Sequence, residues 1–442
     1  MATLTMVATG DSIITRRLSH QEDTAFTDLV ALLRQGQAAF ANLELTTPRR
    51  PFVPGSESGG MWLRCEPFIL DELRWMGFNL FNVATNHATD FTVQGLIDTM
   101  EELRARAMVF AGGGMTLGEA RQPGYLETKG GRVALLAAAS TFGVGAHGAD
   151  PRSDVGGRPG ISPLRFTREY VLDPQRMAAM RDIDEALGTA DWNRRRNRYG
   201  SKEEEAKDAV RIGEMTFVPG EASAIRTRCD RRDLDEIVRW IGDARRGSDY
   251  VLVSLHAHEG AGPTSNSNVP ADFIVEAARA FVDAGADAVL GHGSHQLRAV
   301  EIYRGKPIFF SLGNFMYMSQ TSTNIGGEMY EKLGLPATAT PQDVHDARSM
   351  KPTGEPISFQ ADPVYWESVV PRCRFEDGRL SELTLHPVDL GRERRRPDRG
   401  SPRLATAEHG RAILGRLAEL SAPYGTTIAI EQRGAYAVGV VR

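Results

Sequence analysis

Short apolar runs that end in polar residues alternate with amphipathic segments along most of this chain. The apolar runs predict buried strands at residues 4–11, 39–45, 78–90, 132–140, 249–260, 286–292 and 306–317. Apolar residues at helical spacing predict helices at residues 66–76, 91–108 and 270–284. Because strands and helices alternate, the sequence favours an α/β fold.

Two segments interrupt this alternation. Residues 141–235 are rich in glycine and proline at first and highly charged later, so an inserted loop and helical lobe are expected there. Within this insertion, residues 202–211 predict a helix with one solvated face. Residues 318–363 are polar and contain proline and glycine, which predicts a long loop or lid.

The C-terminal segment, residues 364–442, predicts a hairpin, a helix at about 403–421 and a last strand. We expect these elements to pack on the preceding part of the fold. The length of 442 residues is sufficient for one large core. Residues 1–442 are therefore expected to form a single domain that carries the insertion.

The composition is that of an ordinary globular protein, with 41% hydrophobic residues, 25% charged residues and a formal net charge of −5. Such a chain has no global basic surface for nucleic acid. It has no apolar run of about 18 residues that predicts a membrane span, and its N-terminus lacks the pattern of a signal peptide. The three cysteines are far apart, which is typical of free thiols in a reducing cytoplasm. We therefore expect a cytoplasmic protein that binds neither nucleic acid nor membrane.

Polar residues gather where the predicted strands end. They are Asp11, Asn42, Glu44, Asn86, His87, Asp90, His256, His258, Glu259, His292, His295 and Asn314. Ligand sites in α/β sheets lie outside the carboxyl ends of the strands. A lone histidine in such a place is more often a satisfied turn residue than a ligand. Several strands that end in carboxylate, amide and imidazole groups predict one shared active site.

Six motifs follow one another in an order that is specific to one family. They are TGD at 9–11, ANLE at 41–44, ATNHATDFTVQGL at 84–96, SLHAHEG at 254–260, GADAVLGHGSH at 285–295 and GKPIFFSLGNF at 305–315. Together they resemble the CapA-like proteins, a family named for poly-γ-glutamate capsule synthesis within the metallophosphatase (calcineurin-like) superfamily. The resemblance covers about residues 1–140 and 245–320. It implies a calcineurin-like α/β/β/α sandwich, in which helices flank two packed sheets.

In metallophosphatases these motifs hold two metal ions that activate water. The resemblance implies that Asp11 and His295 face the first metal, and that Glu44 takes the place of the bridging carboxylate. The residues implied at the second metal are Asn86, His256 and His292. His87 is implied as the acid beside the phosphate. Carboxylate, amide and imidazole ligands of this kind suit Mn, Fe or Zn.

The chain departs from the metal motifs of the family. The usual Asp-x-His is Asp11-Ser12-Ile13 here, so the first metal lacks one imidazole ligand. The closing GHxH is GHxxH, which changes the reach of His295, and His258 stands where the CapA pattern normally carries glycine. Metal affinity falls when ligands are lost, so the first site is depleted. We therefore expect that no metal is required.

Without a first metal, Asp11 and His295 are expected near hydrogen-bonding distance, as a pair that can move a proton. The groups expected to hold a substrate oxyanion are Glu44, Asn86, His87, His256 and His292. Removal and return of a proton next to a carbonyl is epimerisation. One branch that this chain resembles is the CapA-like peptide epimerase of lasso-peptide biosynthesis, which inverts the Cα of the C-terminal tryptophan of a ribosomal precursor peptide. The resemblance thus implies an epimerase with Asp11 and His295 as its acid/base pair and a precursor peptide as its substrate.

Substrate contacts are expected from two kinds of side chain. Arg64, or the basic run at residues 194–198, can clamp a terminal carboxylate, and Trp62 can line an indole pocket with Phe315 and Tyr317. The alternatives are a solvated surface for the arginines and a place in the core for the aromatic residues.

Other functions stay open at this point. A metal-dependent hydrolase would act on a phosphoester or a γ-glutamyl substrate, and a binding protein would keep the fold without catalysis. A residual divalent metal (Mn, Fe or Zn) is compatible with the epimerase as well as the hydrolase. Its expected ligands are Asn86, His256, His292 and Glu44.

Overall fold

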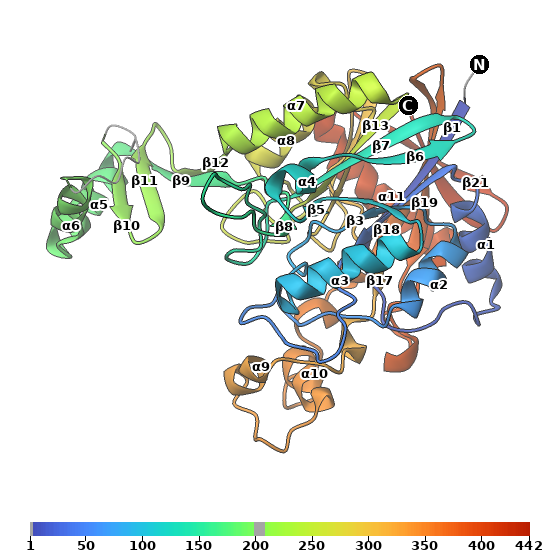
Figure 1. The fold of residues 1–442 in the computed structure, drawn as a ribbon, viewed down its shortest axis with the longest axis horizontal. Coiled ribbons are helices and arrows are strands. Elements are labelled where there is room, and N and C mark those ends of the chain that lie inside the picture. Colours follow the sequence, from blue (N-terminus) through green and yellow to red (C-terminus); the bar gives the residue numbers. More distant parts are fainter. Residues whose placement is uncertain (1–2, 199–207) are drawn as a thin grey trace.

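The computed structural model describes residues 3–198 and 208–442, and shows a mixed α/β protein in which two large sheets pack against each other (Figure 1). Within the described residues the strands form sheets of ten, six, four and two strands. The expected α/β class is therefore confirmed. The alternation of short apolar runs with amphipathic segments predicted this class correctly, because several of the buried parallel strands are followed by a helix that packs on a sheet.

The ten-stranded sheet has the order β21-β22-β19-β18-β1-β2-β3-β4, with β17 beside β1 and β20 beside β19. Its strands are β1 (Thr3–Ile13), β2 (Ala38–Leu43), β3 (Leu80–Asn82), β4 (Val109–Ala111), β17 (Asn314–Tyr317), β18 (Glu367–Glu376), β19 (Arg379–Asp389), β20 (Arg403–Leu404), β21 (Ile428–Arg433) and β22 (Tyr436–Val441). Strands β1 to β4 are parallel, whereas β18 and β19 form an antiparallel hairpin beside β1. The strand expected at residues 78–90 is confined to β3, because Thr85 to Asp90 close hydrogen-bonded turns instead.

The six-stranded sheet has the order β15-β16-β14-β13-β7-β6. Its strands are β6 (Gly124–Thr128), β7 (Gly131–Ala139), β13 (Tyr250–His256), β14 (Ala288–His292), β15 (Val300–Tyr303) and β16 (Lys306–Phe309). The four central strands are parallel. A short pair, β5 (Gly113–Gly114) with β8 (Gly160–Ile161), lies apart from both large sheets in the pairing order.

Three apolar cores give the body its layers. Alternate residues of β1 point to opposite sides: Leu4, Met6 and Ala8 enter the core between the two sheets, and Val7 enters the core beneath the first helices. Helices α1 (Thr24–Leu33), α2 (Phe68–Met76) and α3 (Thr92–Ala105) cover the outer face of the ten-stranded sheet. Helices α7 (Arg231–Gly247) and α8 (Asp272–Asp283) cover the outer face of the six-stranded sheet. Helix α11 (Ala407–Ser421) joins the core between the sheets, and α4 (Leu117–Arg121) is a short connecting helix.

The insertion forms a lobe that projects from this body and differs from the expected helical lobe (Figure 1). Its helices are α5 (Pro174–Ala186) and α6 (Thr189–Arg198), and its strands are β9 (Phe166–Leu172), β10 (Val210–Ile212), β11 (Met215–Pro219) and β12 (Ala224–Cys229). The lobe has a small core of its own, in which Tyr170 packs on Phe217 at 5.4 Å between ring centroids. Of the helix expected at 202–211, residues 202–207 lie outside the described residues, and 210–212 are strand β10. Helix α7 packs on the main body, so the lobe ends before residue 235.

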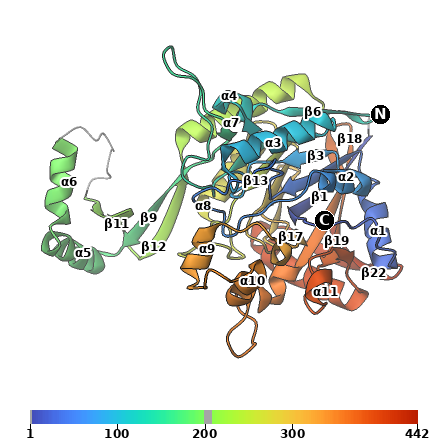
Figure 2. The ribbon, with the colours of Figure 1, turned by 60° about the horizontal axis from the view of Figure 1, so that its bottom comes forward.

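The polar segment expected to be a loop or lid contains short helices. They are η1 (Ser319–Thr321), α9 (Gly327–Lys332), α10 (Pro341–Ser349), η2 (Ser358–Gln360) and η3 (Pro363–Trp366), and the C-terminal region adds η4 (Arg396–Asp398) and η5 (Ala422–Tyr424). Helix α10 begins with a capping box between Thr340 and Asp343. Figure 2 shows α9 and α10 together on one side of the main body.

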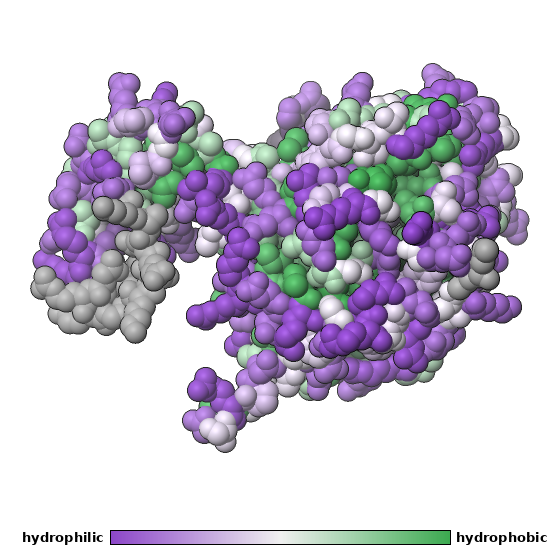
Figure 3. All heavy atoms as spheres, turned by 90° about the horizontal axis from the view of Figure 1, so that it is seen from above, coloured by the Kyte–Doolittle hydropathy of each residue, from purple (hydrophilic) through white to green (hydrophobic). Residues whose placement is uncertain are grey.

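Hydrophilic side chains cover much of the lobe and of the body in the view of Figure 3. Among residues 3–198 and 208–442, no helix combines the length and the apolar character that a membrane crossing needs.

A buried carboxylate fastens the base of the lobe to the body. Asp233, in the first turn of α7, accepts two hydrogen bonds from the Arg165 guanidinium, at 2.7 and 2.8 Å, just before β9 begins. Arg121 of α4 donates a third at 2.6 Å. Burial by itself raises the pKa of Asp233, but the hydrogen bonds and charges of Arg165 and Arg121 outweigh burial and lower it. Asp233 thus joins three segments that are far apart in the sequence.

We expect Asp233→Asn to lower the free energy of unfolding by about 3 kcal/mol near neutral pH, because it leaves two arginines without their buried acid. The pKa of Asp233 is lower in the folded than in the unfolded state. The stability difference between wild type and variant is therefore complete when the pH is above 3.8, the ordinary pKa of aspartate, and it shrinks as the pH falls through the folded pKa. Urea unfolding at several pH values measures both effects. The matched control is Asp235→Asn, an exposed position on the same helix, and an equal loss in both variants would contradict the prediction.

Candidate active site

Parallel pairing brings the polar residues of the sequence motifs to one place. In the ten-stranded sheet, Asp11 is in register with Asn42, and Asn42 with Asn82, at the carboxyl ends of β1, β2 and β3. In the six-stranded sheet, His256 is in register with His292 at the ends of β13 and β14. The two rows face each other, because Asp11 Oδ1 lies 3.8 Å from His292 Nδ1. The site is therefore built where the ends of both sheets meet.

Asp11 and His295 form a contact at the centre of this site. Asp11 Oδ2 lies 3.2 Å from His295 Nδ1, and Asn314 Oδ1 lies 3.0 Å from the same nitrogen. The Asn314 amide nitrogen already donates to two backbone carbonyls, so its oxygen is an acceptor. Because both neighbours accept, we assign the hydrogen to Nδ1, which leaves Nε2 as the free nitrogen of the ring. His295 has a φ of 59°, so the left-handed backbone at this residue helps to set the direction of its ring.

The Asp11 carboxylate is fully buried and held from several sides. Asn42 donates to its Oδ1 at 2.8 Å, and the backbone N–H of Gly293 donates at 3.0 Å. Burial alone raises the pKa of Asp11, but the hydrogen bond and charge of His295, together with His292 and His258, lower it below its ordinary value. Asp11 is thus kept as a carboxylate beneath His295.

Four buried side chains form a hydrogen-bonded chain behind the central pair. The Ser254 hydroxyl lies 2.6 Å from His292 Nε2, His292 Nδ1 lies 3.0 Å from His256 Nδ1, and His256 Nε2 lies 2.8 Å from Asn86 Oδ1. One set of neutral tautomers satisfies every contact, with each group donating to the next, from Ser254 to Asn86. Burial lowers the pKa of His292 to about 4 and, with the neighbouring histidines, the pKa of His256 well below its usual value. Both imidazoles are therefore neutral near neutral pH.

Glu44 is the one fully buried acid of the site without a hydrogen bond to either carboxyl oxygen in the described part of the chain. Its Oε1 lies 3.7 Å from His256 Nε2, 3.8 Å from His295 Nε2 and 3.9 Å from His87 Nε2. Burial, followed by the negative charges of Asp11 and Asp90, raises the pKa of Glu44 well above its ordinary value. A carboxyl group in this position is either protonated or paired with a cation.

Two groups of three side chains have the spacing of a metal site among the described residues. One is Asp11 with His256 and His292, and the other is Glu44 with His258 and His295. The donor types and the unpartnered Glu44 oxygens fit a divalent ion. These groups differ from the expected set of Asn86, His256, His292 and Glu44. Asn86 binds His256 instead, and His258, which replaces the glycine of the CapA pattern, supplies an additional imidazole.

A second carboxylate–imidazole pair stands beside the first. His87 Nδ1 lies 2.7 Å from Asp90 Oδ2, and Asp90 also accepts the backbone N–H groups of Leu63 and Gly59. These bonds fix the ring of His87 with Nε2 toward Glu44. His258 is fixed by Asn266, whose Oδ1 lies 2.9 Å from His258 Nδ1. His87, His258 and His295 are the histidines of the strand-end cluster that line the adjoining cavity.

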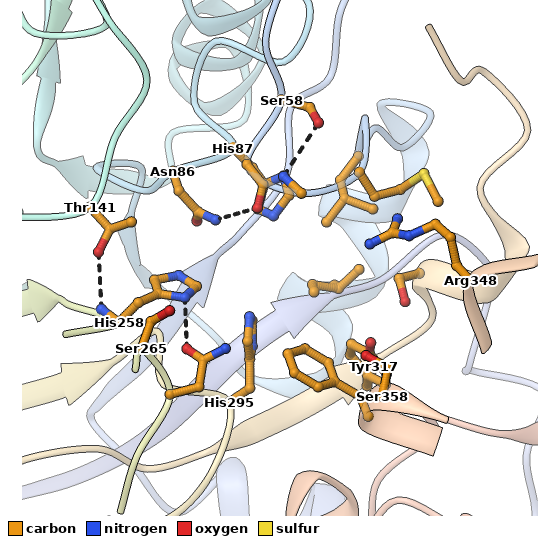
Figure 4. A pocket seen from close by; sticks show the side chains of 18 of the residues that line it. Ser58, Asn86, His87, Thr141, His258, Ser265, His295, Tyr317, Arg348 and Ser358 are labelled. Atoms are coloured by element: carbon orange, nitrogen blue, oxygen red, sulfur yellow. Dashed lines mark hydrogen bonds between the residues drawn. The ribbon is translucent and has the colours of Figure 1, made fainter. Parts of the chain in front are cut away.

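This cavity has a volume of about 710 Å³ and lies between the strand ends and the segment 318–363 (Figure 4). Its size is in the range of small-molecule and peptide-end sites. The side chains of Tyr317 and Phe359 form an aromatic wall next to His295, with Phe359 5.2 Å from the imidazole centroid. Asp11, Glu44, His256 and His292 lie behind the lining, so Asp11 reaches the cavity through His295.

The residues expected to bind the ends of a substrate lie elsewhere. Arg64 bonds to Asn324 and Glu66 and does not line the cavity. Trp62 is 3% exposed, donates to the Gly55 carbonyl and does not line the cavity either. The alternative of a place in the core therefore describes Trp62, and Arg64 is held by neighbouring polar side chains.

The basic run is on the exposed surface of the lobe. Arg194 and Arg195 pair with Asp191, and the side chains of Arg196 and Arg198 lie outside the described residues. Of the cysteines, Cys65 is buried, and burial raises the pKa of its thiol. Cys65 is therefore a poor acid or base.

Several cavity residues carried no signal in the sequence. They are Arg168, Gln320, Arg348 and Phe359, together with Gln360. Four of these lie in the segment that was expected to be a loop or lid, where neither periodicity nor motif marks individual side chains. His258, Asn42 and Asn314 did belong to the strand-end cluster, but their roles as orienting groups depend on distances that a sequence does not give.

Fold and site together define a mixed α/β protein with a buried carboxylate–imidazole centre of the kind that binds divalent metals. The chain belongs to the family described as bacterial capsule synthesis protein PGA_cap, whose model matches residues 5–319. Since this match includes all the site motifs, the expected CapA-like resemblance is confirmed.

The chain is also similar to individual proteins of known name. It is 38% identical to the uncharacterized protein y4sH of Sinorhizobium fredii, over 99% of this chain and 93% of that protein. It is 26% identical to the PGA biosynthesis protein CapA of Bacillus subtilis, over 62% of this chain and 53% of that protein. It is 22% identical to the capsule biosynthesis protein CapA of Bacillus anthracis, over 71% of this chain and 60% of that protein.

We expect Glu44→Gln to raise the free energy of unfolding of the chelator-treated protein, by on the order of 1 kcal/mol near neutral pH, because it removes a buried acid without a partner. The folded pKa of Glu44 is raised, so this acid lowers stability increasingly as the pH rises above its ordinary value of 4.5. The gain should therefore vanish in acid. Urea unfolding near neutral pH and near pH 4.5 tests this.

The matched control for Glu44 is Glu259→Gln. Glu259 is also buried but accepts hydrogen bonds from the hydroxyls of Ser140 and Thr141, so its replacement should lower stability. A chelator-treated Glu44→Gln variant that is less stable than the wild type near neutral pH would contradict our account of Glu44.

Proposed function

We propose that this protein is an epimerase that inverts the Cα of the C-terminal tryptophan of a ribosomal lasso-peptide precursor by 1,1-proton transfer. The observation that carries the proposal is the contact of Asp11 with His295 Nδ1, which leaves His295 Nε2 free at the wall of the cavity. A base with one nitrogen held by a carboxylate and the other open to substrate is suited to proton transfer. No metal is required for this step.

In this mechanism His295 Nε2 takes the proton from Cα, the Cα–H electron pair moves into the adjacent carbonyl, and an enolate forms. Asp11 stabilises the imidazolium and positions the ring, but does not touch the substrate. The enolate oxygen needs fixed donors in a site from which water is excluded.

Return of the proton to the opposite face completes the inversion. His87 is a suitable donor, because its Nε2 lies 3.9 Å from the same Glu44 oxygen that lies 3.8 Å from His295 Nε2. Two imidazoles, each held by an aspartate, thus lie near the same Glu44 oxygen, and the two-base mechanism needs the substrate Cα between them, with His87 donating as the imidazolium. In a one-base mechanism His295 delivers the proton itself, after the enolate or the base has moved.

A second candidate function is metal-dependent hydrolysis of a phosphoester or γ-glutamyl bond. We interpret the two packed sheets with their outer helices as the metallophosphatase sandwich, and the unpartnered, buried Glu44 carboxyl favours a cation site. Asp11, His256 and His292 would hold one ion, and Glu44, His258 and His295 another. A bound ion would supply an activated water and polarise the scissile bond.

We expect the chelator-treated protein in D2O to place one non-exchangeable deuterium at the terminal residue of a tryptophan-ended precursor peptide, as read by mass spectrometry. His295→Gln should lower this rate by at least about 100-fold, because it removes the base. Asp11→Asn should lower kcat with little change in KM, because Asp11 acts through His295. His20→Gln, at an exposed position outside the site, is the matched control and should leave the rate unchanged.

Two results would end the epimerase proposal. One is the absence of deuterium in the peptide with every variant and with the wild type. The other is phosphoester cleavage that appears only after Mn²⁺ is restored, which would favour the hydrolase. A deuterium signal that persists in His295→Gln but disappears in His87→Gln would instead assign the first proton transfer to His87.

A further inference from the structure

Arg348 is a cationic side chain without an acidic partner inside the cavity. It lies in the last turn of α10 and lines the cavity, with its guanidinium directed inward on the side opposite Thr141 and His258 (Figure 4). Within the described residues it makes no hydrogen bond or ion pair, whereas Arg396, which packs against the same helix, pairs with Asp346. Burial lowers the pKa of Arg348, yet an arginine keeps its charge under such conditions. A half-buried guanidinium without a partner is costly unless a ligand supplies the missing anion.

Two buried amides lie in the same segment and also lack partners. Gln320 of η1 and Gln360 of η2 are each 8% exposed, line the cavity, and have an Oε1 atom without a hydrogen bond in the described structure. An amide oxygen only accepts, so an anion is bound by the Nε2–H groups, which rotation of the side-chain amide turns toward the cavity without breaking a hydrogen bond of Oε1. The segments are tied together, because His345 of α10 bonds to the Ser322 carbonyl and Ser349 accepts the Ile357 N–H. The residues Arg348, Gln320 and Gln360, which we call the polar cradle, therefore belong to one connected unit.

The aromatic wall lies between the polar cradle and the proton-transfer pair. Tyr317 is close enough to Arg348 for each to perturb the pKa of the other, and its ring centroid lies 6.4 Å from that of His295. Phe359, the residue before Gln360, also lines the cavity, and its ring centroid lies 5.2 Å from that of His295. A substrate residue whose Cα faces His295 would thus lie beside the aromatic wall, and the Arg348 guanidinium would lie on the far side of that wall from His295.

We propose that Arg348, with Gln320 and Gln360, binds the free C-terminal carboxylate of the substrate peptide, and that the side chain of the last residue packs on Tyr317 and Phe359. This inference rests on the proposed epimerase function and adds a rule of specificity to it. A guanidinium binds a carboxylate through two parallel hydrogen bonds, which fix both distance and orientation. The terminal residue, and not an internal one, is then held with its Cα at His295.

The experiment compares two peptides on the full-length, chelator-treated protein. One is a tryptophan-ended precursor peptide with a free C-terminal acid, and the other is the same peptide with a C-terminal amide. We expect calorimetric titration to show about 30-fold tighter binding of the acid by the wild type. Arg348→Gln should lose this preference by weakening the acid alone, and Arg348→Lys should keep part of it.

Two control variants separate a specific clamp from general charge. Arg168→Gln removes another cavity arginine, located on β9, whose buried Nε also lacks a hydrogen-bond partner within the described residues. We expect it to keep the acid preference, and loss of that preference in Arg168→Gln but not in Arg348→Gln would overturn the proposal by assigning the carboxylate to Arg168. Lys351→Gln removes an exposed charge two residues beyond α10 and should change neither affinity. Circular dichroism of each variant verifies that it is folded.

The results distinguish failure of the carboxylate clamp from failure of the epimerase function. An acid preference that survives Arg348→Gln, or the absence of binding by both peptides, overturns the carboxylate clamp. Deuterium incorporation at equal kcat/KM for acid and amide also overturns it, while the epimerase function stands. Acid-selective binding that depends on Arg348, with no deuterium incorporated by the wild type, supports the clamp and removes the proposed function.

Discussion

Parallel pairing of strands is the constraint on which the site depends. Strands β1, β2 and β3 run parallel to one another, and so do β13 and β14. Their carboxyl ends therefore lie along one edge of each sheet, and the polar residues at these ends are in register. Packing of the two sheets then brings both rows within contact distance, through a core of side chains such as Leu4, Leu135 and Leu252. The chemistry is therefore assembled by the cores, and any change that tilts one sheet against the other separates Asp11 from the histidines that face it.

The buried acids of the site differ in their hydrogen bonds. Asp11 and Asp90 each accept hydrogen bonds and orient a histidine, whereas Glu44 accepts none within the described residues. The arrangement is therefore compatible with both proposed chemistries, which differ in what stands next to Glu44. With a proton there, the site is a set of neutral and paired imidazoles around a cavity, and with a cation it is a metal centre. Measurements of metal content are therefore informative about both proposed functions.

Much of this arrangement could be predicted from the sequence, and the reasons for the rest are physical. The α/β class and the strand-end cluster followed from apolar periodicity, because short-range pattern determines which residues are buried. The motifs at residues 9–11, 84–96 and 285–295 are sufficient to indicate the family, because they lie within the segment that the family model matches. The lobe was expected to be helical because its charged composition hides the alternation of β9 and β12, which pair with each other over six residues.

The residues of the cavity wall could not be predicted from the sequence, for a different reason. Arg348 and Gln320 are unremarkable in a polar segment, and they stand out only because, in the part of the chain that the structure describes, they lie at the cavity with unpartnered polar groups. Conversely, the residue types of Arg64 and Trp62 suited a substrate, but Arg64 bonds to Asn324 and Trp62 to the Gly55 carbonyl. Residue type indicates what a side chain can bind, but not the direction in which it points.

The lobe has a consequence of a different kind. Its core of Met177, Val210 and Phe217 forms a cluster separate from the three cores of the body, and β9 and β12 are its connection to the sheets. The described lobe residues 173–198 and 208–224 are thus remote from the geometry at the strand ends. In a chain built in this way, the surface of the lobe can change during evolution while the residues at the strand ends stay the same. Relatives with the same centre therefore need not bind the same partners.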